Sequence, residues 1–171
     1  MHGESLIEIK GKLPELMPRL WRFAIMLTRN EDTAEDLVQS ACLRMLEKAS
    51  AYAPNSSFDR WAFTVMANLH RSNLRRQKGR QKDGEEALAT LPDEAPSPLE
   101  SIFHDQVMTA IAGLSTEQRA VVTLVCAEGY TYQQTAEILE TPIGTVMSRL
   151  HAARRRLGWL REEGDRPRAK D

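Results

Sequence analysis

The sequence predicts an all-α protein made of two small helical domains joined by a flexible acidic linker. Apolar residues recur at steps of three and four rather than two, which favours helices over strands. A proline-rich acidic stretch divides the chain. The 171 residues suffice for two small domains, and 42% apolar with 27% charged residues is typical of a soluble globular protein.

Proline and acidic residues set the expected domain boundaries. The stretch DGEEALATLPDEAPSPLES places Pro92, Pro96 and Pro98 among acids and small residues, a composition typical of an extended linker. The expected organisation is a first domain over 1–83, the linker over 84–104, a second domain over 105–161 and a charged, disordered tail over 162–171.

Three helices are expected in the first domain. Residues 12–28 carry a leucine and phenylalanine stripe at helical spacing. The second helix follows from about residue 30, with acids near its start and Lys48 near its end, as the helix dipole favours. A loop, AYAPNSSF, precedes a third helix from about Phe58 to Gly79.

In the second half of the chain, helical spacing resumes at about Leu99 and continues through IFHDQVMTAIAGL. Three further helices are expected there, in EQRAVVTLVCAEG, in YQQTAEIL and in 141–157. The expected caps and stops are Ser115 or Thr116, Gly129, Thr131 and Thr141, with Pro142 at the first position of the last helix.

The last two of these helices have the layout of a helix-turn-helix, because only a few residues around Thr141 separate them. In 141–157, one face is apolar and the other is rich in arginine. The second helix of this motif lies in the major groove of DNA, and its first backbone N–H groups bind phosphate. The expected DNA contacts are Gly144, Thr145, Met147, Ser148, Arg149, His151, Ala152, Arg154 and Arg155.

The charges are sorted along the chain although their sum is only −1. Residues 68–82 contain lysine and arginine and residues 141–161 contain arginine, and neither stretch has an acid. Residues 83–105 contain seven acids and no lysine or arginine. Such separation favours contact with nucleic acid, and a merely solvated basic face is the alternative.

The helix expected to begin at Phe58 combines aromatic and basic residues. Phe58, Trp61 and Phe63 lie near its start, and its second half is strongly basic. Aromatic side chains beside a basic surface suit unpaired bases. Trp61 has apolar neighbours at four-residue steps, so burial in the core is the competing interpretation.

Three stretches, in this order, resemble the extracytoplasmic-function class of bacterial RNA polymerase sigma factors. TAEDLVQSACLRMLEKA is similar to region 2.2, which docks on the polymerase clamp. SSFDRWAFTVMANLHRSNLRRQ is similar to regions 2.3 and 2.4, which open and read the promoter −10 element. LSTEQRAVVTLVCAEGYTYQQTAEILETPIGTVMSRLHAARRRL is similar to region 4, which reads the −35 element.

The resemblance implies roles for particular residues. Polymerase-clamp contacts fall on Glu35, Asp36, Gln39 and Leu43, and −10 contacts on Asn55, Ser56, Phe58, Asn68, Arg71, Arg75 and Arg76. Asn55, Ser56 and Phe58 belong to the loop that captures a flipped base in this family. The implied partners are core RNA polymerase, through its β′ clamp helices and β flap, promoter DNA and an anti-sigma factor. No cofactor or small-molecule substrate is implied.

The sequence also departs from the family pattern. Met147 and Ala152 stand where a basic residue is frequent, so we expect a −35 sequence other than the family's commonest one. Thr135 and Glu140 replace an isoleucine and a glycine that are common in the first helix of the motif.

Other classes of protein are less consistent with these patterns. The chain has no catalytic constellation and no metal-ligand spacing, so neither an enzyme nor a metal site is expected. Cys42 and Cys126 are expected to be small core residues. Without a signal peptide or a membrane-length apolar run, a cytoplasmic protein, not itself a membrane protein, is expected.

Two alternatives remain open. A stand-alone helix-turn-helix regulator would need a dimerisation surface to match a two-fold operator, and residues 1–83 contain neither a coiled coil nor a ligand pocket. A sigma mimic that only titrates an anti-sigma factor would not need the basic residues of the two acid-free stretches.

Overall fold

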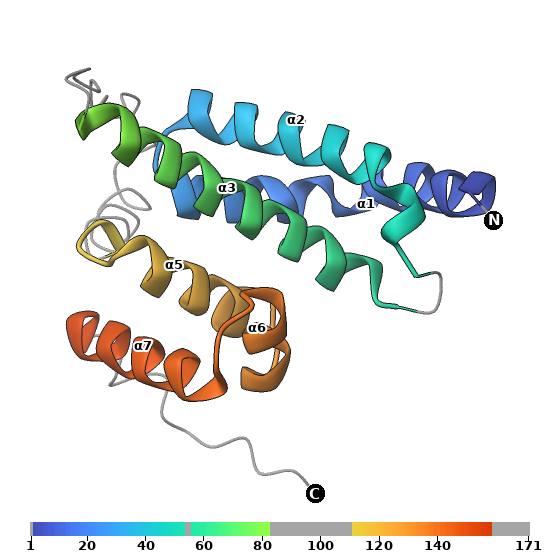
Figure 1. The fold of residues 1–171 in the computed structure, drawn as a ribbon. Helices are drawn as coiled ribbons and strands as arrows, with labels where there is room; N and C mark the ends of the chain where they lie inside the picture. Colours follow the sequence, from blue (N-terminus) through green and yellow to red (C-terminus); the bar gives the residue numbers. More distant parts are fainter. Residues whose placement is uncertain (1, 54–55, 83–110, 159–171) are drawn as a thin grey trace, which may run out of the picture.

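The computed structural model describes residues 2–53, 56–82 and 111–158, and every element in these ranges is helical (Figure 1). The first half consists of α1 (His2–Thr28), α2 (Glu31–Glu47), a short 3-10 turn and α3 (Phe58–Lys82). The second half consists of α5 (Thr116–Val122), a π-helical turn (Thr123–Ala127), α6 (Tyr132–Ile138) and α7 (Ile143–Arg156). The all-α prediction is confirmed, whereas the expected linker and tail lie outside the described residues.

The first half is a bundle in which α1, α2 and α3 pack against one another. Its core contains Leu20, Phe23, Met45 and Phe63, all with fully buried side chains. The rings of Phe23 on α1 and Phe63 on α3 meet edge to face, with centroids 5.2 Å apart. This geometry is favourable for aromatic pairs and fixes α3 across α1.

Helix α1 begins earlier than its sequence indicates, near residue 2 rather than 12. The additional turns are held by packing, because Ile9 is fully buried. The hydroxyl of Tyr52 also donates a hydrogen bond to the Glu8 carboxylate at 3.2 Å. Tertiary contacts thus extend α1 beyond the stretch in which the sequence shows clear helical periodicity. The helix also continues through Pro14 and Pro18.

The second half folds around α5 and α7. The expected caps at Ser115 and Thr131 are confirmed, and each side-chain hydroxyl accepts a bond from a backbone N–H within a capping box. Gly129, at φ +76°, follows the π-helical turn in the left-handed conformation that glycine adopts most readily. The expected burial of Cys126 is wrong, because its side chain faces solvent, whereas Cys42 is half-buried against Met17.

The two halves pack directly on each other. Helix α5 lies between α1 and α7 (Figure 1), and α6 contacts α3. One continuous cluster of buried apolar side chains runs from α1, α2 and α3 into α5, α6 and α7. Within this cluster the ring of Tyr130 packs edge to face on the ring of Phe63, with centroids 5.7 Å apart. The described residues therefore form one folded body.

Candidate nucleic-acid interface

Helix α7 presents one buried and one exposed face, as its sequence predicts. Val146, Leu150, Ala153 and Leu157 are all at most 5% exposed and pack into the second half. On the opposite face Met147 is 52% exposed, and Ser148, His151, Arg154 and Arg155 are also exposed. Arg149 and Ala152 are half-buried. A helix with this division can enter a DNA groove while its back remains dry.

The turn before α7 differs from the expected capping arrangement. Pro142, not Thr141, occupies the N-cap position, and no side chain caps the helix. The backbone N–H of Thr141 donates instead to the carbonyl of Ala136 at 3.0 Å, which closes the end of α6. The N–H groups at Gly144 and Thr145 lie at the start of α7, where the helix dipole is positive.

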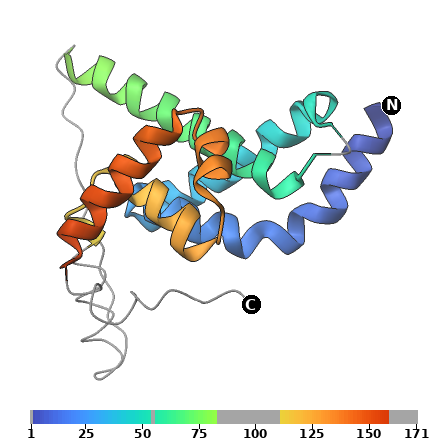
Figure 2. The ribbon, with the colours of Figure 1, turned by 90° about the horizontal axis from the view of Figure 1, so that it is seen from below.

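Helix α3 carries the second basic surface. Arg75 and Arg76 are exposed on the C-terminal half of α3, and the end of this helix projects from the packed body (Figure 2). Arg71 is half-buried and already engaged, donating to the side chain of Asn68 at 3.0 Å and to the carbonyl of Leu139 at 2.6 Å. The side chains of Arg75 and Arg76 are thus exposed to solvent, whereas the guanidinium of Arg71 is hydrogen-bonded to the second half of the protein.

The loop before α3 corrects one expectation. Phe58 is the first residue of α3 rather than a loop residue, and it is 6% exposed because its ring packs edge to face on Tyr52. Trp61 is half-buried beside both rings, as the core interpretation requires. Ser56 is exposed, whereas Asn55 lies outside the described residues.

The expected polymerase-binding residues share the solvent face of α2. Glu35, Asp36, Gln39 and Leu43 are all exposed, and Leu43 is 62% exposed despite being a large apolar residue. The opposite face of α2 is buried against α1 and α3. These four side chains are therefore accessible to a partner protein.

The basic surfaces of α3 and α7 meet at one groove of about 360 Å³ between the two halves. Arg71 and Arg75 line it from α3, and Arg149 lines it from α7. Glu117, at the start of α5, also lines this groove. Its pKa lies below the usual value, first because of a backbone hydrogen bond and then because of the Ser115 hydroxyl and the charges of Arg149 and Lys78. Acids of the second half therefore share this space with arginines from both surfaces.

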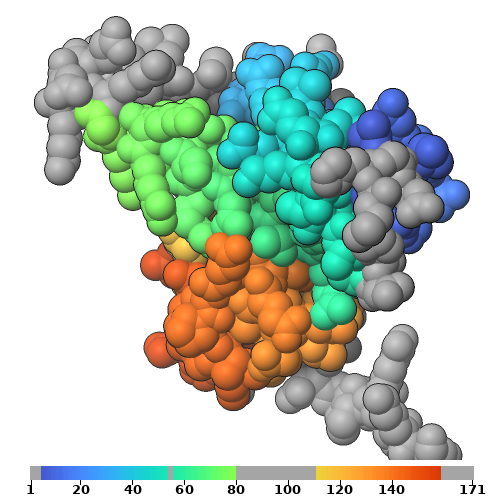
Figure 3. Space-filling model, turned by 45° about the vertical axis from the view of Figure 1, so that its right-hand side comes forward, coloured from blue at the N-terminus to red at the C-terminus, as the bar shows by residue number. Residues whose placement is uncertain are grey.

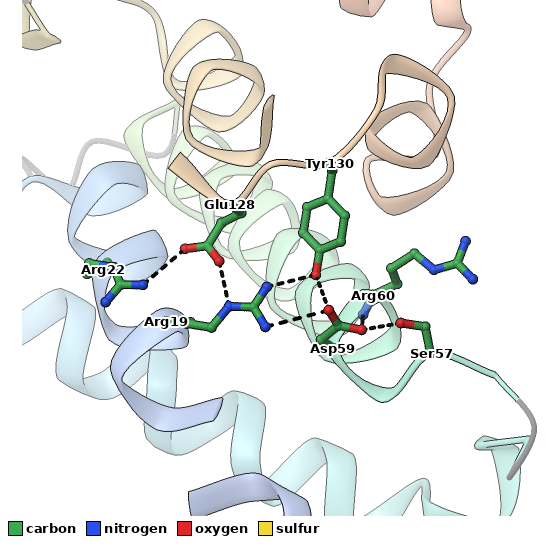
Figure 4. A network of polar contacts seen from close by, with 7 residues as sticks. All are labelled: Arg19, Arg22, Ser57, Asp59, Arg60, Glu128 and Tyr130. Atoms are coloured by element: carbon green, nitrogen blue, oxygen red, sulfur yellow. Dashed lines mark hydrogen bonds and ion pairs between the residues drawn. The ribbon is translucent and has the colours of Figure 1, made fainter. Parts of the chain in front are cut away.

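A polar network, which the sequence does not indicate, joins the halves at the opposite end of α3 (Figure 4). Arg19 of α1 donates to Glu128 at 2.6 Å and to the hydroxyl of Tyr130 at 3.1 Å. That hydroxyl donates in turn to Asp59 of α3 at 2.6 Å. Burial and the bond to Asp59 raise the pKa of Tyr130. We call Arg19, Asp59, Glu128 and Tyr130 the clasp.

Arg119 makes a further contact between the halves. Its guanidinium is buried and donates to the carbonyls of Met26 at 2.6 Å and Leu27 at 3.1 Å, at the end of α1. The last carbonyls of a helix have no partner within it, so this arginine satisfies part of the C-terminus of α1. Within the described ranges, no group of His, Cys, Asp and Glu is arranged to hold a metal ion. None of the helices described is both long and apolar enough to cross a bilayer.

The fold and these surfaces define a helical protein with two exposed basic helix faces, one of them in a helix-turn-helix, and a further helix, α2, with an exposed polar face. Comparison with known families makes the assignment specific. Residues 15–80 match Sigma-70 region 2, and residues 104–157 match Sigma-70, region 4. The chain belongs to the extracytoplasmic-function sigma factors of bacterial RNA polymerase.

Individual relatives support this family over most of the chain. The chain is 33% identical to the sigma factor EcfG of Rhodopseudomonas palustris over 84% of its own length and 80% of that protein. It is also 33% identical to SigL of Mycobacterium tuberculosis, over 84% and 83% of the two chains. Among solved structures, it is similar to the sigma factor RpoE of Bartonella quintana, determined in complex with the anti-sigma factor NepR. That match has a TM-score of 0.71 and 31% identity, and it covers 93% of this chain and 99% of that one.

Proposed function

We propose that this chain binds core RNA polymerase through the exposed face of α2 and directs it to promoters with two separate DNA-reading surfaces. The surface of α3, with Asn68, Arg71, Arg75 and Arg76, reads the −10 element, and the loop at Ser56 contributes to it. The exposed face of α7 reads the −35 element. In this proposal the protein is a cytoplasmic transcription initiation factor that catalyses no reaction itself.

The observation that carries this proposal is that two separate basic helix faces are each backed by buried apolar side chains. The face of α7 opposite its basic residues is buried and includes Val146, Leu150 and Ala153. Behind α3 lies the aromatic core of the first half, including Phe63. A stand-alone helix-turn-helix regulator needs only the first of these surfaces.

Control by an anti-sigma protein is the second part of the proposal. The similar RpoE of Bartonella quintana was solved with its anti-sigma factor NepR, and this likeness extends over nearly the whole of both chains. A protein that covers the α2 face or the two basic surfaces would prevent initiation. Its addition to a reconstituted reaction would abolish transcription without unfolding this chain.

The experiment is run-off transcription on genomic fragments with purified core polymerase, in which RNA 5′ ends are sequenced with and without this protein. New starts that share two upstream sequence boxes are expected. An Arg149→Ala variant should lose these starts, whereas Lys10→Ala, which removes one exposed charge far along α1, should retain them. Polymerase binding without new starts would favour a decoy for an anti-sigma factor and contradict the proposal.

A further inference from the structure

We propose that the packed arrangement of the two halves is a self-inhibited state, in which acids of the second half occupy arginines that would otherwise bind promoter DNA. The inference rests on the proposed function of α3 and α7. In this state the second half competes with DNA for the arginines of α3. Figure 3 shows the second half packed directly against that helix.

The C-terminal end of α6 supplies the competing negative charge. Glu137 pairs with Arg60 of α3 at 3.2 Å, and the carbonyl of Leu139 accepts a 2.6 Å hydrogen bond from Arg71. The Glu140 carboxylate lies 3.9 Å from the same guanidinium. The end of a helix carries partial negative charge, so its carbonyl and two carboxylates together resemble a short run of phosphates. Arg71 cannot serve α6 and DNA simultaneously.

Backbone strain at Glu140 is consistent with a role for its side chain. Its φ of +48° is in the left-handed region, where a residue with a Cβ atom is disfavoured. Glycine would adopt this conformation without that cost. A charged side chain that faces Arg71 stands at this position instead.

The geometry of the groove also separates this state from a DNA-reading state. Arg71 and Arg75 of α3 line the same 360 Å³ space as Arg149 of α7. The −10 and −35 elements are centred about 25 base pairs apart, which is roughly 85 Å of duplex at about 3.4 Å per base pair. Surfaces that meet across one groove cannot reach both elements, so the halves must separate before the promoter is read.

The clasp holds this state closed without using any proposed DNA or polymerase contact. The side chain of Glu128 is 2% exposed and lies 2.6 Å from Arg19, with Arg22 at 3.5 Å. A buried carboxylate of this kind depends on its cationic partners. If the open form is a minor population, its small fraction lowers the apparent affinity for DNA in proportion. Weakening the clasp should therefore raise the affinity.

The test compares the full chain with Glu128→Gln, which weakens the clasp, and with Glu140→Gly, which removes both the strain and the carboxylate beside Arg71. The matched control is Glu47→Gln, because Glu47 is exposed on α2 and removal of its charge affects only a 3.7 Å pair within that helix. Small-angle X-ray scattering measures the radius of gyration. Fluorescence anisotropy measures affinity for a labelled 40-base-pair duplex of mixed sequence. Thermal unfolding of the separate variants checks that each is folded.

Glu128→Gln and Glu140→Gly should each increase the radius of gyration and bind the duplex about tenfold more tightly, because a larger fraction of the chain is open. Glu47→Gln should match the wild type. Expansion without tighter binding would overturn the inhibitory role. If Glu47→Gln bound the duplex equally tightly, the loss of one negative charge at any position would explain the tighter binding. That result would also overturn the inhibitory role. Transcription with core polymerase, measured in parallel, separates the two proposals: an active wild type with unchanged affinity in the expanded variants overturns only the self-inhibition.

Discussion

His70 gives the protein a pH dependence whose size follows from its position between the two halves. The residue is 8% exposed, and within the described part of the chain its Nε2 atom has no hydrogen-bond partner. Burial, and then the charge of Arg119, lowers the pKa of its imidazole from 6.5 to about 4, with Glu117 opposing the shift. The folded protein therefore keeps this imidazole neutral at pH values where the unfolded chain protonates it.

The sign and magnitude follow from proton linkage. Because the folded pKa is depressed, the unfolded state binds more protons below pH 6.5, and stability falls as the pH falls from about 6.5 towards 4. A shift from 6.5 to about 4 corresponds to a total of about 3 kcal/mol, of which about 2 kcal/mol is lost between pH 7 and pH 5. Depressed carboxylate pKa values, such as that of Asp59, take effect at lower pH.

The assay is urea unfolding of the wild type and of His70→Leu at pH 7 and at pH 5. The leucine variant has no titrating group at this position, so it reports the pH response of the remainder of the chain. The wild type should lose about 2 kcal/mol more free energy of unfolding than the variant over this interval. Equal losses in the two proteins, with equal denaturant slopes, would refute the assignment of His70 as a neutral buried imidazole.

Three further substitutions test other parts of the structure. Thr135→Val should raise the free energy of unfolding by about 1 kcal/mol, because the buried Thr135 hydroxyl has no partner among the described residues; an unchanged or lower melting temperature would contradict this. Arg119→Met should lower the free energy of unfolding by about 3 kcal/mol, since the carbonyls of Met26 and Leu27 lose their donor, and a loss below about 1 kcal/mol in urea unfolding would argue against this contact. Leu43→Asp should weaken binding to core polymerase at least about tenfold in sedimentation or fluorescence titration, while the unfolding free energy stays within about 0.5 kcal/mol of the wild type. Unaltered polymerase affinity would remove α2 from the proposed interface.

Local patterns in the sequence predict much of the secondary structure and one face of α7. Its apolar stripe is buried as expected, because steps of three and four residues place those side chains on one side of any regular helix. The caps at Ser115 and Thr131 are likewise local, since each hydroxyl accepts from a backbone N–H three residues further on. Such features depend mainly on residues within the same helix or helical turn.

The features that sequence reasoning missed depend on residues far apart in the chain. Arg19 appears in the sequence as one more charge on a helix, and Glu128 as a polar residue before a glycine, yet they are 109 positions apart and only 2.6 Å from each other. Cys126 follows an apolar run but faces solvent, because the backbone turns through a π-helical segment there. The proposed roles of the DNA and polymerase contacts remain predictions for the experiments above.

The continuity of the apolar cluster has a consequence for biosynthesis. The ribosome delivers the first half before the second, so the edge of Phe63 and the final carbonyls of α1 emerge without Tyr130 and Arg119. The interval between residues 63 and 130 corresponds to roughly 3–13 s of elongation at about 5–20 residues per second. During that interval the nascent first half exposes apolar surface that the finished protein covers. We expect a chain that ends after α3 to keep this surface exposed and therefore to be prone to aggregation.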